Sequence, residues 1–528
     1  MAAESEPDVL TLQEAAEFVR VSEKTLRGLA REGRAPGQKV GREWRFLRSA
    51  LESWLAGQEP GGAVAEPQVQ YQLPFMKRKA PPPDDKSERA GFGDTAFTKN
   101  RSQPLHRWVP WIAGFSASFV GGVLEAASER DSADVTVFDP FAGVGTTLVE
   151  ALERGHDAIG FELNPYAALV CGAKVRCLSY DLEVLASAVT GFREHMRRKA
   201  RSKPRAQPPP EFKSRAPFFS PKVERKVLRV LDFIAEQEID WVSDLFRVAL
   251  GAVMVGFSNY SYEPSLGRRK SAGKDDVLDA DVAGAVAAKL DEMLNDMAQM
   301  QLRMASLGRT PQIEVFTENV LASYERVPAH SVDFLITSPP YLNNYHYIRN
   351  TRPHLFWLGL VDKRAELKAM EHESFGKFWQ TVRSGPRIDL EFDSGDLAEK
   401  LDYLRSLRRE KGAYGGQGWA NYAAAYFNDC LAFCRAARAV MKPQGTAVVV
   451  IGNNILQGVE FKTDQYFAQI AERCGFEVVD LHRVRKKRTG SSILNSSVRR
   501  GGKVKKRVDL YETAVELRAP ATRGKSKN

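Results

Sequence analysis

A serine, two prolines and a tyrosine follow one another at Ser338-Pro339-Pro340-Tyr341, shortly after the apolar run Val332–Ile336. The run has the pattern of a buried strand, and two adjacent prolines cannot continue it because proline has no N–H to donate to a sheet. The chain must therefore leave the strand in a rigid turn, beside an aromatic ring that is suited to stacking on a planar group. A plain Pro-Pro turn with no chemical role is the alternative interpretation.

A second candidate site lies in the stretch "VFDPFAGVGTTLVEAL", residues 137–152, where a strand gives way to a helix. Gly143 and Gly145 lie in the intervening turn and allow the backbone to come close to a ligand. Glu162 ends the next expected strand, 19 residues after Gly143, and could accept hydrogen bonds from both hydroxyls of a ribose. A helix N-cap or a surface ion pair would also explain Glu162. The stretch lacks the G-x-G-x-x-G spacing and the Walker lysine, so a dinucleotide or ATP is less expected.

Short apolar strands alternate with helices from residue 104 onward. The expected strands are Val135–Phe138, Ala158–Phe161, Ile313–Phe316, Val332–Ile336, Thr446–Ile451, Phe476–Leu481 and Tyr511–Leu517. The expected helices between them include Thr146–Arg154, Pro165–Cys177, Tyr422–Met441 and Asp464–Cys474. This alternation predicts an α/β fold with a largely parallel sheet that is covered on both faces.

Together the two motifs resemble the amino-methylating DNA methyltransferases of the cytosine-N4/adenine-N6 type. Their cofactor loop commonly has the pattern D-P-F-x-G-x-G-T-T, and their catalytic loop is S-P-P-Y or D-P-P-Y. The resemblance covers roughly residues 104–180 and 311–518. It implies a seven-stranded, mostly parallel Rossmann-like methyltransferase sheet, with S-adenosyl-L-methionine bound at the ends of the first strands.

The resemblance also implies roles for individual residues. It assigns the cofactor to Asp139, Pro140, Phe141, Ala142, Gly143, Gly145, Thr146, Glu162, Asn164 and Glu318. Glu318 stands where the family usually has an aspartate near the adenine. Trp111 or Phe115 would complete the cofactor wall, although both could equally be core aromatics. No metal is expected, because Cys430 and Cys434 share one helix face without a second pair to complete a zinc set.

On this resemblance, Ser338, Pro339, Pro340 and Tyr341 form the catalytic loop. The exocyclic amine of a nucleobase is a poor nucleophile, because its lone pair is delocalised into the ring. The Ser338 oxygen and the Pro339 carbonyl could accept both amine hydrogens, while Tyr341 stacks on a base extruded from the duplex. Transfer is then a direct displacement that depends on alignment. Methylation at carbon 5 needs a cysteine, typically after a proline, and no cysteine here follows a proline.

Residues 1–56 resemble the excisionase-family, MerR-like winged helix-turn-helix module. A helix at Leu12–Val19, a second helix opened by Ser22, a hairpin turning at Gly41 and a helix from Ser49 give its order of elements. The resemblance assigns Lys24, Thr25, Arg27 and Arg31 to the DNA groove and Lys39, Arg42 and Arg45 to backbone phosphates. A small adaptor that binds protein is the alternative.

The net charge of +10 is concentrated near the C-terminus, where residues 482–507 contain eleven lysines and arginines and no acid. Such a segment favours a polyanionic partner, although a solvated loop would have the same composition. It joins the sixth and seventh expected strands. The resemblance implies that the seventh strand runs antiparallel, so this segment should open at the same sheet edge as the catalytic loop. The predicted DNA contacts there are Arg485, Lys486, Lys487 and Arg488.

These features divide the chain into eight segments. They are a winged helix-turn-helix domain at 1–56, a linker at 57–100, the cofactor half of the core at 101–180, a mainly helical insertion at 181–310, the core with the catalytic loop at 311–344, a second insertion at 345–418, the rest of the core with the basic hairpin at 419–518 and a disordered tail at 519–528. Either insertion could read the DNA target.

The prediction is therefore a site-specific DNA methyltransferase that acts on cytosine N4 by base flipping, in a restriction-modification or phage-defence system. Within the family, serine at the first catalytic position favours cytosine over adenine. The alternatives are an adenine-N6 DNA methyltransferase, an RNA amino-methyltransferase and a non-catalytic DNA-binding regulator. Expected partners are duplex DNA and a companion restriction endonuclease or defence proteins. Five cysteines, no secretion signal and no membrane-spanning run favour a cytoplasmic, nucleoid-associated protein.

Overall fold

A computed structural model describes the chain in two compact units, Met1–Tyr71 and Gln72–Asn528. The described residues are 9–31, 35–40, 43–48, 51, 97–111, 114, 116–128, 135–262, 265–306, 309–342, 346–486 and 510–521. The predicted turn at Gly41 and the start of the helix at Ser49 lie outside these residues.

The first unit is a small helix-turn-helix domain. Its elements are β1 (Val9–Thr11), α1 (Leu12–Phe18), α2 (Glu23–Arg31), β2 (Gly37–Val40) and β3 (Glu43–Leu47). The Thr11 hydroxyl caps α1, accepting a hydrogen bond from the Glu14 N–H at 3.3 Å, and the Ser22 hydroxyl caps α2 in the same way. Three antiparallel strands in the order β1-β3-β2 close the domain over a core that includes Leu26 and Phe46. The three-residue strand β1 carried no signal in the sequence.

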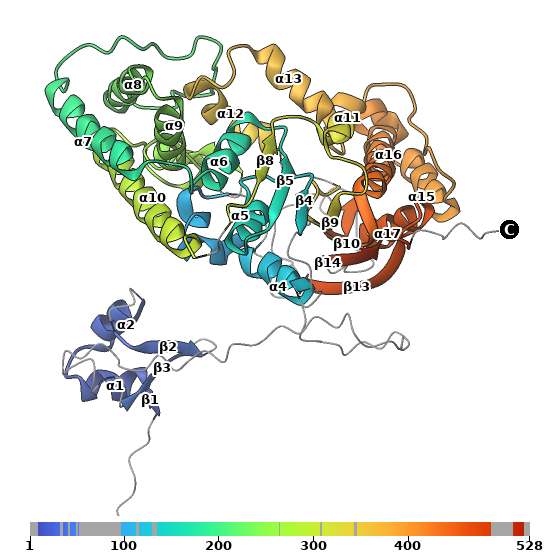
Figure 1. The fold of residues 1–528 in the computed structure, drawn as a ribbon, viewed down its shortest axis with the longest axis horizontal. Coiled ribbons are helices and arrows are strands. Elements are labelled where there is room, and N and C mark those ends of the chain that lie inside the picture. Colours follow the sequence, from blue (N-terminus) through green and yellow to red (C-terminus); the bar gives the residue numbers. More distant parts are fainter. Residues whose placement is uncertain are drawn as a thin grey trace, which may run out of the picture. The chain divides into compact units, whose positions relative to one another are not determined.

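The second unit is built on a seven-stranded sheet, as predicted (Figure 1). Its strands are β4 (Thr136–Asp139), β5 (Asp157–Phe161), β8 (Ile313–Phe316), β9 (Val332–Thr337), β10 (Met441–Gly452), β13 (Glu477–Lys486) and β14 (Tyr511–Arg518). Their order in space is β13-β14-β10-β9-β4-β5-β8, and β14 alone runs antiparallel to its neighbours. The carboxyl ends of the other six strands therefore meet at one edge.

Both faces of this sheet are buried, because successive apolar residues along a strand point to opposite faces. Phe334 and Ile336 face one core, which they share with helices α4 (Ala117–Ser128), α5 (Thr146–Glu153) and α6 (Pro165–Val175). Leu335, between them, faces a second core with α16 (Gly416–Val440) and α17 (Thr463–Arg473). Continuous apolar strands covered on both sides are typical of parallel sheets.

The first insertion is a group of helices that extends the first core (Figure 1). It contains α7 (Leu182–Arg198), α8 (Pro221–Ala235), α9 (Asp240–Met254), β6 (Tyr260–Tyr262), β7 (Leu266–Arg268), η3 (Arg269–Ala272) and α10 (Val282–Met304). The predicted methionine stripe of α10 is buried there, at Met293, Met297, Met300 and Met304. The stripe is therefore helix packing.

The remaining elements are shorter helices and one hairpin, and several of these helices pack on α16. They are η1 (Phe97–Ser102), η2 (His106–Trp108), α11 (Val320–Ser323), η4 (Tyr324–Arg326), α12 (Tyr347–Trp357), α13 (Arg364–Glu373), α14 (Trp379–Val382), α15 (Gly395–Ser406), η5 (Arg409–Tyr414), β11 (Asn454–Leu456) and β12 (Val459–Phe461). The hairpin of β11 and β12 was not foreseen. No helix among the described residues is long and apolar enough to cross a bilayer.

Several boundaries differ from those expected. Helix α16 begins at Gly416, six residues before Tyr422, and Met441 lies in a strand rather than in the helix. Strand β10 starts early because its pairing with β9 skips from Met441 to Thr446, leaving an irregular bulge that the apolar pattern could not show. Ala519, assigned to the tail, is fully buried, and its N–H donates to the Gly445 carbonyl at 2.9 Å. Residues 522–528 lie outside the described part.

A buried carboxylate on α10 holds the segment that leads into the sheet. Asp296 accepts hydrogen bonds from the Leu105 N–H at 2.9 Å and from the Trp108 indole N–H at 3.1 Å. The Arg107 guanidinium donates two more, at 2.5 and 3.1 Å, and this carboxylate raises the pKa of Arg107. The first insertion thus fixes residues 105–108, just before Trp111.

We expect Asp296→Ala to lower the free energy of unfolding of this unit by about 3 kcal/mol, because two buried donors and a charged group lose their acceptor. Urea unfolding followed by tryptophan fluorescence measures this change. The matched control is Asp291→Ala on the same helix, where the half-exposed pair with Arg193 should contribute less than about 1 kcal/mol. Equal effects of the two substitutions would show that the Asp296 cluster does not anchor the segment.

Candidate active site

The turn after β4 is shaped by two glycines with left-handed backbone. Gly143 has φ +52° and Gly145, the N-cap of α5, has φ +85°. A Cβ at Gly145 would lie 2.8 Å from the Cys171 sulfur on α6, so only glycine allows this close packing. The Ala142 N–H donates to the Phe161 carbonyl at 2.9 Å and holds the turn against β5.

Asp139 ties this turn to the strand that carries the catalytic motif. It is fully buried at the end of β4, and one of its oxygens accepts from the Thr337 hydroxyl at 2.6 Å and from the Phe141 N–H at 3.0 Å. Burial raises the pKa of Asp139 to about 6, although the hydrogen bond from Thr337 opposes the rise. Asp139 therefore acts as a brace behind the turn.

Glu162 at the end of β5 turns its carboxylate toward the glycine turn. One oxygen accepts from the Gly143 N–H at 2.9 Å and the other from the Asn164 N–H at 2.7 Å. Desolvation raises the pKa of Glu162 to about 7, and these two hydrogen bonds lower it less than desolvation raises it. Each oxygen keeps acceptor capacity for a ligand.

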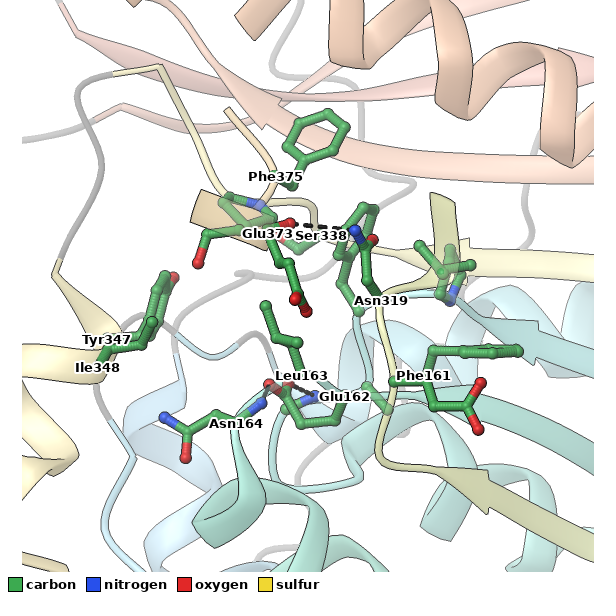
Figure 2. Close-up of a pocket in the computed structure, with 18 of the residues that line it drawn as sticks. Phe161, Glu162, Leu163, Asn164, Asn319, Ser338, Tyr347, Ile348, Glu373 and Phe375 are labelled. Carbon is green, nitrogen blue, oxygen red and sulfur yellow. Dashed lines mark hydrogen bonds between the residues drawn. The ribbon is translucent and has the colours of Figure 1, made fainter. Parts of the chain in front are cut away.

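These groups line one open cavity that encloses about 1100 Å³ of space, including its mouth. Figure 2 shows Glu162 and Asn164 on one side of the cavity, Glu373 and Phe375 across from them, and Tyr347 at a third side. This size and mixture of aromatic and polar walls suit a small organic ligand.

The Ser338–Tyr341 loop enters the same cavity from the end of β9, where Ser338 and Pro340 form part of the wall. The Ser338 hydroxyl lies 3.2 Å from the Val450 carbonyl, to which it donates, and 3.4 Å from the Tyr341 hydroxyl. The half-buried Tyr341 ring packs at the end of β10, where a Cβ at Gly452 would lie 3.2 Å from it. The cavity therefore joins the glycine turn to the proline loop.

Comparison with known proteins agrees with this geometry. The chain is 21% identical over 436 residues to the type II methyltransferase M.BsoBI of Geobacillus stearothermophilus, covering 75% of this chain and 83% of that protein. It is 25% identical over 413 residues to the type II methyltransferase M.AvaI of Anabaena variabilis, covering 72% and 81%. Residues 9–59 match a family described as a helix-turn-helix domain, and residues 113–170 match the N6/N4 family described as DNA methylase. Over most of its length the chain is therefore similar to type II methyltransferases, and residues 113–170 are similar to the N6/N4 DNA methylases.

A solved structure, the rRNA methyltransferase aviRa from Streptomyces viridochromogenes, is matched over 78% of this chain and 88% of that chain. The sequence identity is 9% and the TM-score 0.29.

The fold brings most of the predicted cofactor residues together. The lining residues among them are Pro140, Phe141, Ala142, Gly143, Thr146, Glu162, Asn164 and Glu318. Asp139 and Gly145 are not among the lining residues, nor are Pro339 and Tyr341 of the predicted catalytic loop. Trp111 lines the cavity, whereas Phe115 lies outside the described residues.

Two of the lining side chains are already engaged. Glu318 makes a two-point ion pair with Arg326, at 2.8 and 2.6 Å, which lowers the pKa of Glu318. Asn164 caps α6 through its oxygen, and its amide group donates to the Thr351 hydroxyl at 2.7 Å. Both residues shape the wall, and neither needs a ligand to satisfy it.

The second insertion contributes a wall that the sequence did not reveal. Tyr347 and Ile348 begin α12, and the segment from Glu373 to Phe378 follows α13. Phe375 packs edge-on against Phe141, with ring centroids 5.0 Å apart, and this places the segment over the glycine turn. Glycine and aromatic residues occur in many loops, so no sequence motif indicated that this segment forms part of the site.

Contacts with α16 hold the same segment in place. The Gly376 N–H donates to the Asp429 carboxylate at 2.8 Å, and the Lys377 ammonium lies 3.7 Å from it. Gly376 has φ +74°, and a Cβ there would lie 2.7 Å from the Tyr426 ring. This wall of the cavity is therefore held by specific contacts.

The predicted DNA contacts are only partly described. On α2, Thr25 and Arg27 are exposed, and Arg27 pairs loosely with Glu23 at 3.7 Å. On β3, Arg45 pairs with Glu43, and on β13 Arg485 lies 3.9 Å from Glu512. The side chains of Lys24, Arg31, Lys39 and Lys486, and the whole of Arg42, Lys487 and Arg488, lie outside the described residues.

We expect the affinity of the protein for S-adenosylmethionine to fall about fourfold between pH 8.5 and 6.5. The ionised Glu162 carboxylate is the better acceptor for ribose hydroxyls, and the protonated form becomes populated as the pH drops below about 7. Isothermal titration calorimetry across this range measures the change. In Glu162→Gln, which keeps the shape but cannot ionise, binding should be weaker at pH 8.5 and the pH dependence lost. A variant that retains the slope would assign the titration to another group.

Proposed function

We propose that this methyltransferase transfers a methyl group from S-adenosylmethionine to the exocyclic N4 amine of cytosine in duplex DNA. The observation that supports this most directly is the shared cavity, in which Glu162 and the glycine turn lie opposite Ser338 and Pro340. A donor and an acceptor held in one hollow can be aligned for direct transfer, which supplies much of the catalysis.

The residues present fit the cofactor. The Glu162 carboxylate retains acceptor capacity for two ribose hydroxyls, and the missing side chain at Gly143 leaves room for a ligand against the backbone. When bound, S-adenosylmethionine supplies an electrophilic methyl group on a sulfonium. Glu162 would hold the sugar, and the walls from Phe141 and Phe375 would exclude water.

The hydrogen bonding of Ser338 suits it to the acceptor role. Its hydroxyl donates to the Val450 carbonyl, so its lone pairs remain available for an amine hydrogen. The Pro339 carbonyl is the proposed second acceptor, and prolines at 339 and 340 offer no competing N–H. Accepting both hydrogens makes the amine nitrogen more nucleophilic.

Tyr341 is the proposed stacking platform for the target base. An amine inside the duplex cannot reach a methyl donor, so the base must be extruded. The Tyr341 ring is half-buried and lies against Gly452 at the end of β10. Support of this kind fixes the angle at which a base would stack.

Cytosine is proposed over adenine because the first catalytic position is the neutral Ser338 rather than an aspartate, a preference drawn from the family. Adenine N6 is the second candidate, since a hydroxyl can accept from either amine. An RNA substrate is disfavoured by the helix-turn-helix domain, and a purely regulatory role is disfavoured by the intact glycine and proline loops.

The biological setting proposed is a type II modification system. The similarity to M.BsoBI and M.AvaI, both type II methyltransferases, supports this assignment. On that basis we propose a companion restriction endonuclease or other defence protein, a cytoplasmic, nucleoid-associated location and target reading by one of the insertions. The helix-turn-helix domain would add DNA affinity or regulate the operon.

We expect DNA from cells that express this chain to contain N4-methylcytosine at one short sequence. Nucleoside mass spectrometry identifies the modified base, and single-molecule sequencing locates it. N6-methyladenine instead would reassign the base while keeping the mechanism. An unmodified genome, together with no transfer to purified DNA, would overturn the proposal.

We expect Ser338→Ala to lower kcat about 100-fold with little change in the Kd for S-adenosylmethionine, because it removes an acceptor used only in transfer. Single-turnover transfer of labelled methyl groups and calorimetry give the two quantities. The control is Ser331→Ala, an exposed hydroxyl that bonds only the nearby Pro328 carbonyl at the entrance to the same strand. Equal loss of cofactor binding and transfer in Ser338→Ala would indicate a structural role.

A further inference from the structure

Three side-chain positions form a row across the edge of the sheet that carries the catalytic loop. Gly452 of β10 is paired with Glu512 of β14, and Glu512 is in turn paired with Arg485 of β13. Residues directly opposite each other in antiparallel strands project to the same face, with Cβ atoms about 5 Å apart. The Glu512 and Arg485 side chains therefore lie on the face of the sheet toward which a side chain at position 452 would point.

Tyr341 occupies the first place in this row. A Cβ built at Gly452 would lie 3.2 and 3.3 Å from two carbons of the Tyr341 ring, so the ring fills the space that a side chain at 452 would take. Its neighbour along the row is the Glu512 side chain. The catalytic loop thus rests on the end of β10, beside a carboxylate from the last strand.

The Glu512 carboxylate is unusual in being almost fully buried, with only 7% of the residue exposed. A buried carboxylate is costly unless it is compensated, and the Arg485 guanidinium lies 3.9 Å away, across the strand pair. The negative field of Glu512 adds to burial in raising the pKa of Tyr341, and the positive field of Arg485 opposes it. These two charges therefore act on the ring that touches Ser338.

We propose that Glu512, held by Arg485, is a positioning residue that sets the orientation of Tyr341 and, through it, of Ser338. The Ser338 hydroxyl lies 3.4 Å from the Tyr341 hydroxyl, and a carboxylate beside the phenol favours turning its O–H away from Ser338. The phenol then does not donate to Ser338, whose hydroxyl donates to the Val450 carbonyl and whose lone pairs stay available for the amine. This assignment deepens the proposed methyl transfer and rests on it.

The arrangement also links the catalytic loop to the basic hairpin. Arg485 lies near the end of β13, within the basic run of residues 482–507, and its side chain is 42% exposed while it lies 3.9 Å from Glu512. A phosphate that drew Arg485 away would weaken the positive field that opposes Glu512 at Tyr341. Binding of a DNA phosphate to Arg485 would in this way change the electrostatic field at Tyr341.

The test compares Glu512→Gln with Glu516→Gln in the full-length protein. Glu516 is a matched control, because it lies on the same face of β14, is only 2% exposed and pairs with His482 at 3.0 Å, but is remote from Gly452 in the register. Single-turnover methyl transfer to DNA and the Kd for S-adenosylmethionine are measured for each. A 3-fluorotyrosine introduced at position 341 reports the ring environment through its fluorine NMR shift.

We expect Glu512→Gln to slow transfer about tenfold, to leave the Kd for the cofactor within about twofold and to shift the fluorine signal. Glu516→Gln should leave the rate and the signal unchanged, even if it lowers stability. Arg485→Gln should also slow transfer, and the double variant Glu512→Gln/Arg485→Gln should lose less than the product of the two single losses, because the two side chains interact.

Wild-type transfer in Glu512→Gln, or equal losses in the two glutamate variants, would overturn the inference. An unmoved fluorine signal would do the same. If the wild-type protein itself transfers no methyl group to DNA in this assay, the failure lies with the proposed function instead. A fluorine shift in Glu512→Gln would then still show that the carboxylate governs Tyr341.

Discussion

The 2.6 Å hydrogen bond from Thr337 to Asp139 is the interaction on which the site depends. These residues lie at the ends of the adjacent parallel strands β9 and β4 and are fully buried. One residue beyond Thr337 begins the proline loop, and one residue beyond Asp139 begins the glycine turn. Because the bond is shielded from water and reinforced by the sheet, the two halves of the site cannot drift apart.

Other parts of the chain complete the cavity around this fixed pair. The first insertion holds the segment before Trp111 through Asp296, and the second insertion places Phe375 against Phe141. Segments with no catalytic motif therefore build walls of the site. This division is common in α/β proteins, where ligands bind at the carboxyl ends of strands and the loops define the pocket.

The sequence predicted those features that arise from local patterns. Short apolar runs such as Val332–Ile336 identified all seven strands of the large sheet, and the glycine and proline motifs placed Gly143 and Ser338 at strand ends. It failed where conformation depends on tertiary contacts. The wall at Gly376 is set by Asp429 and Tyr426, and neither contact has a signature in the order of residues. The row of Gly452 and Glu512 likewise depends on strand register, which only the folded sheet fixes.

The position of β14 has a consequence for biosynthesis. This strand lies between β10 and β13, so β13 has no partner in the sheet until Tyr511–Arg518 has emerged from the ribosome. The support for the proline loop at Gly452 is likewise incomplete until then. A nascent or prematurely terminated polypeptide that already contains the helix-turn-helix domain would thus lack the finished sheet edge that supports this loop.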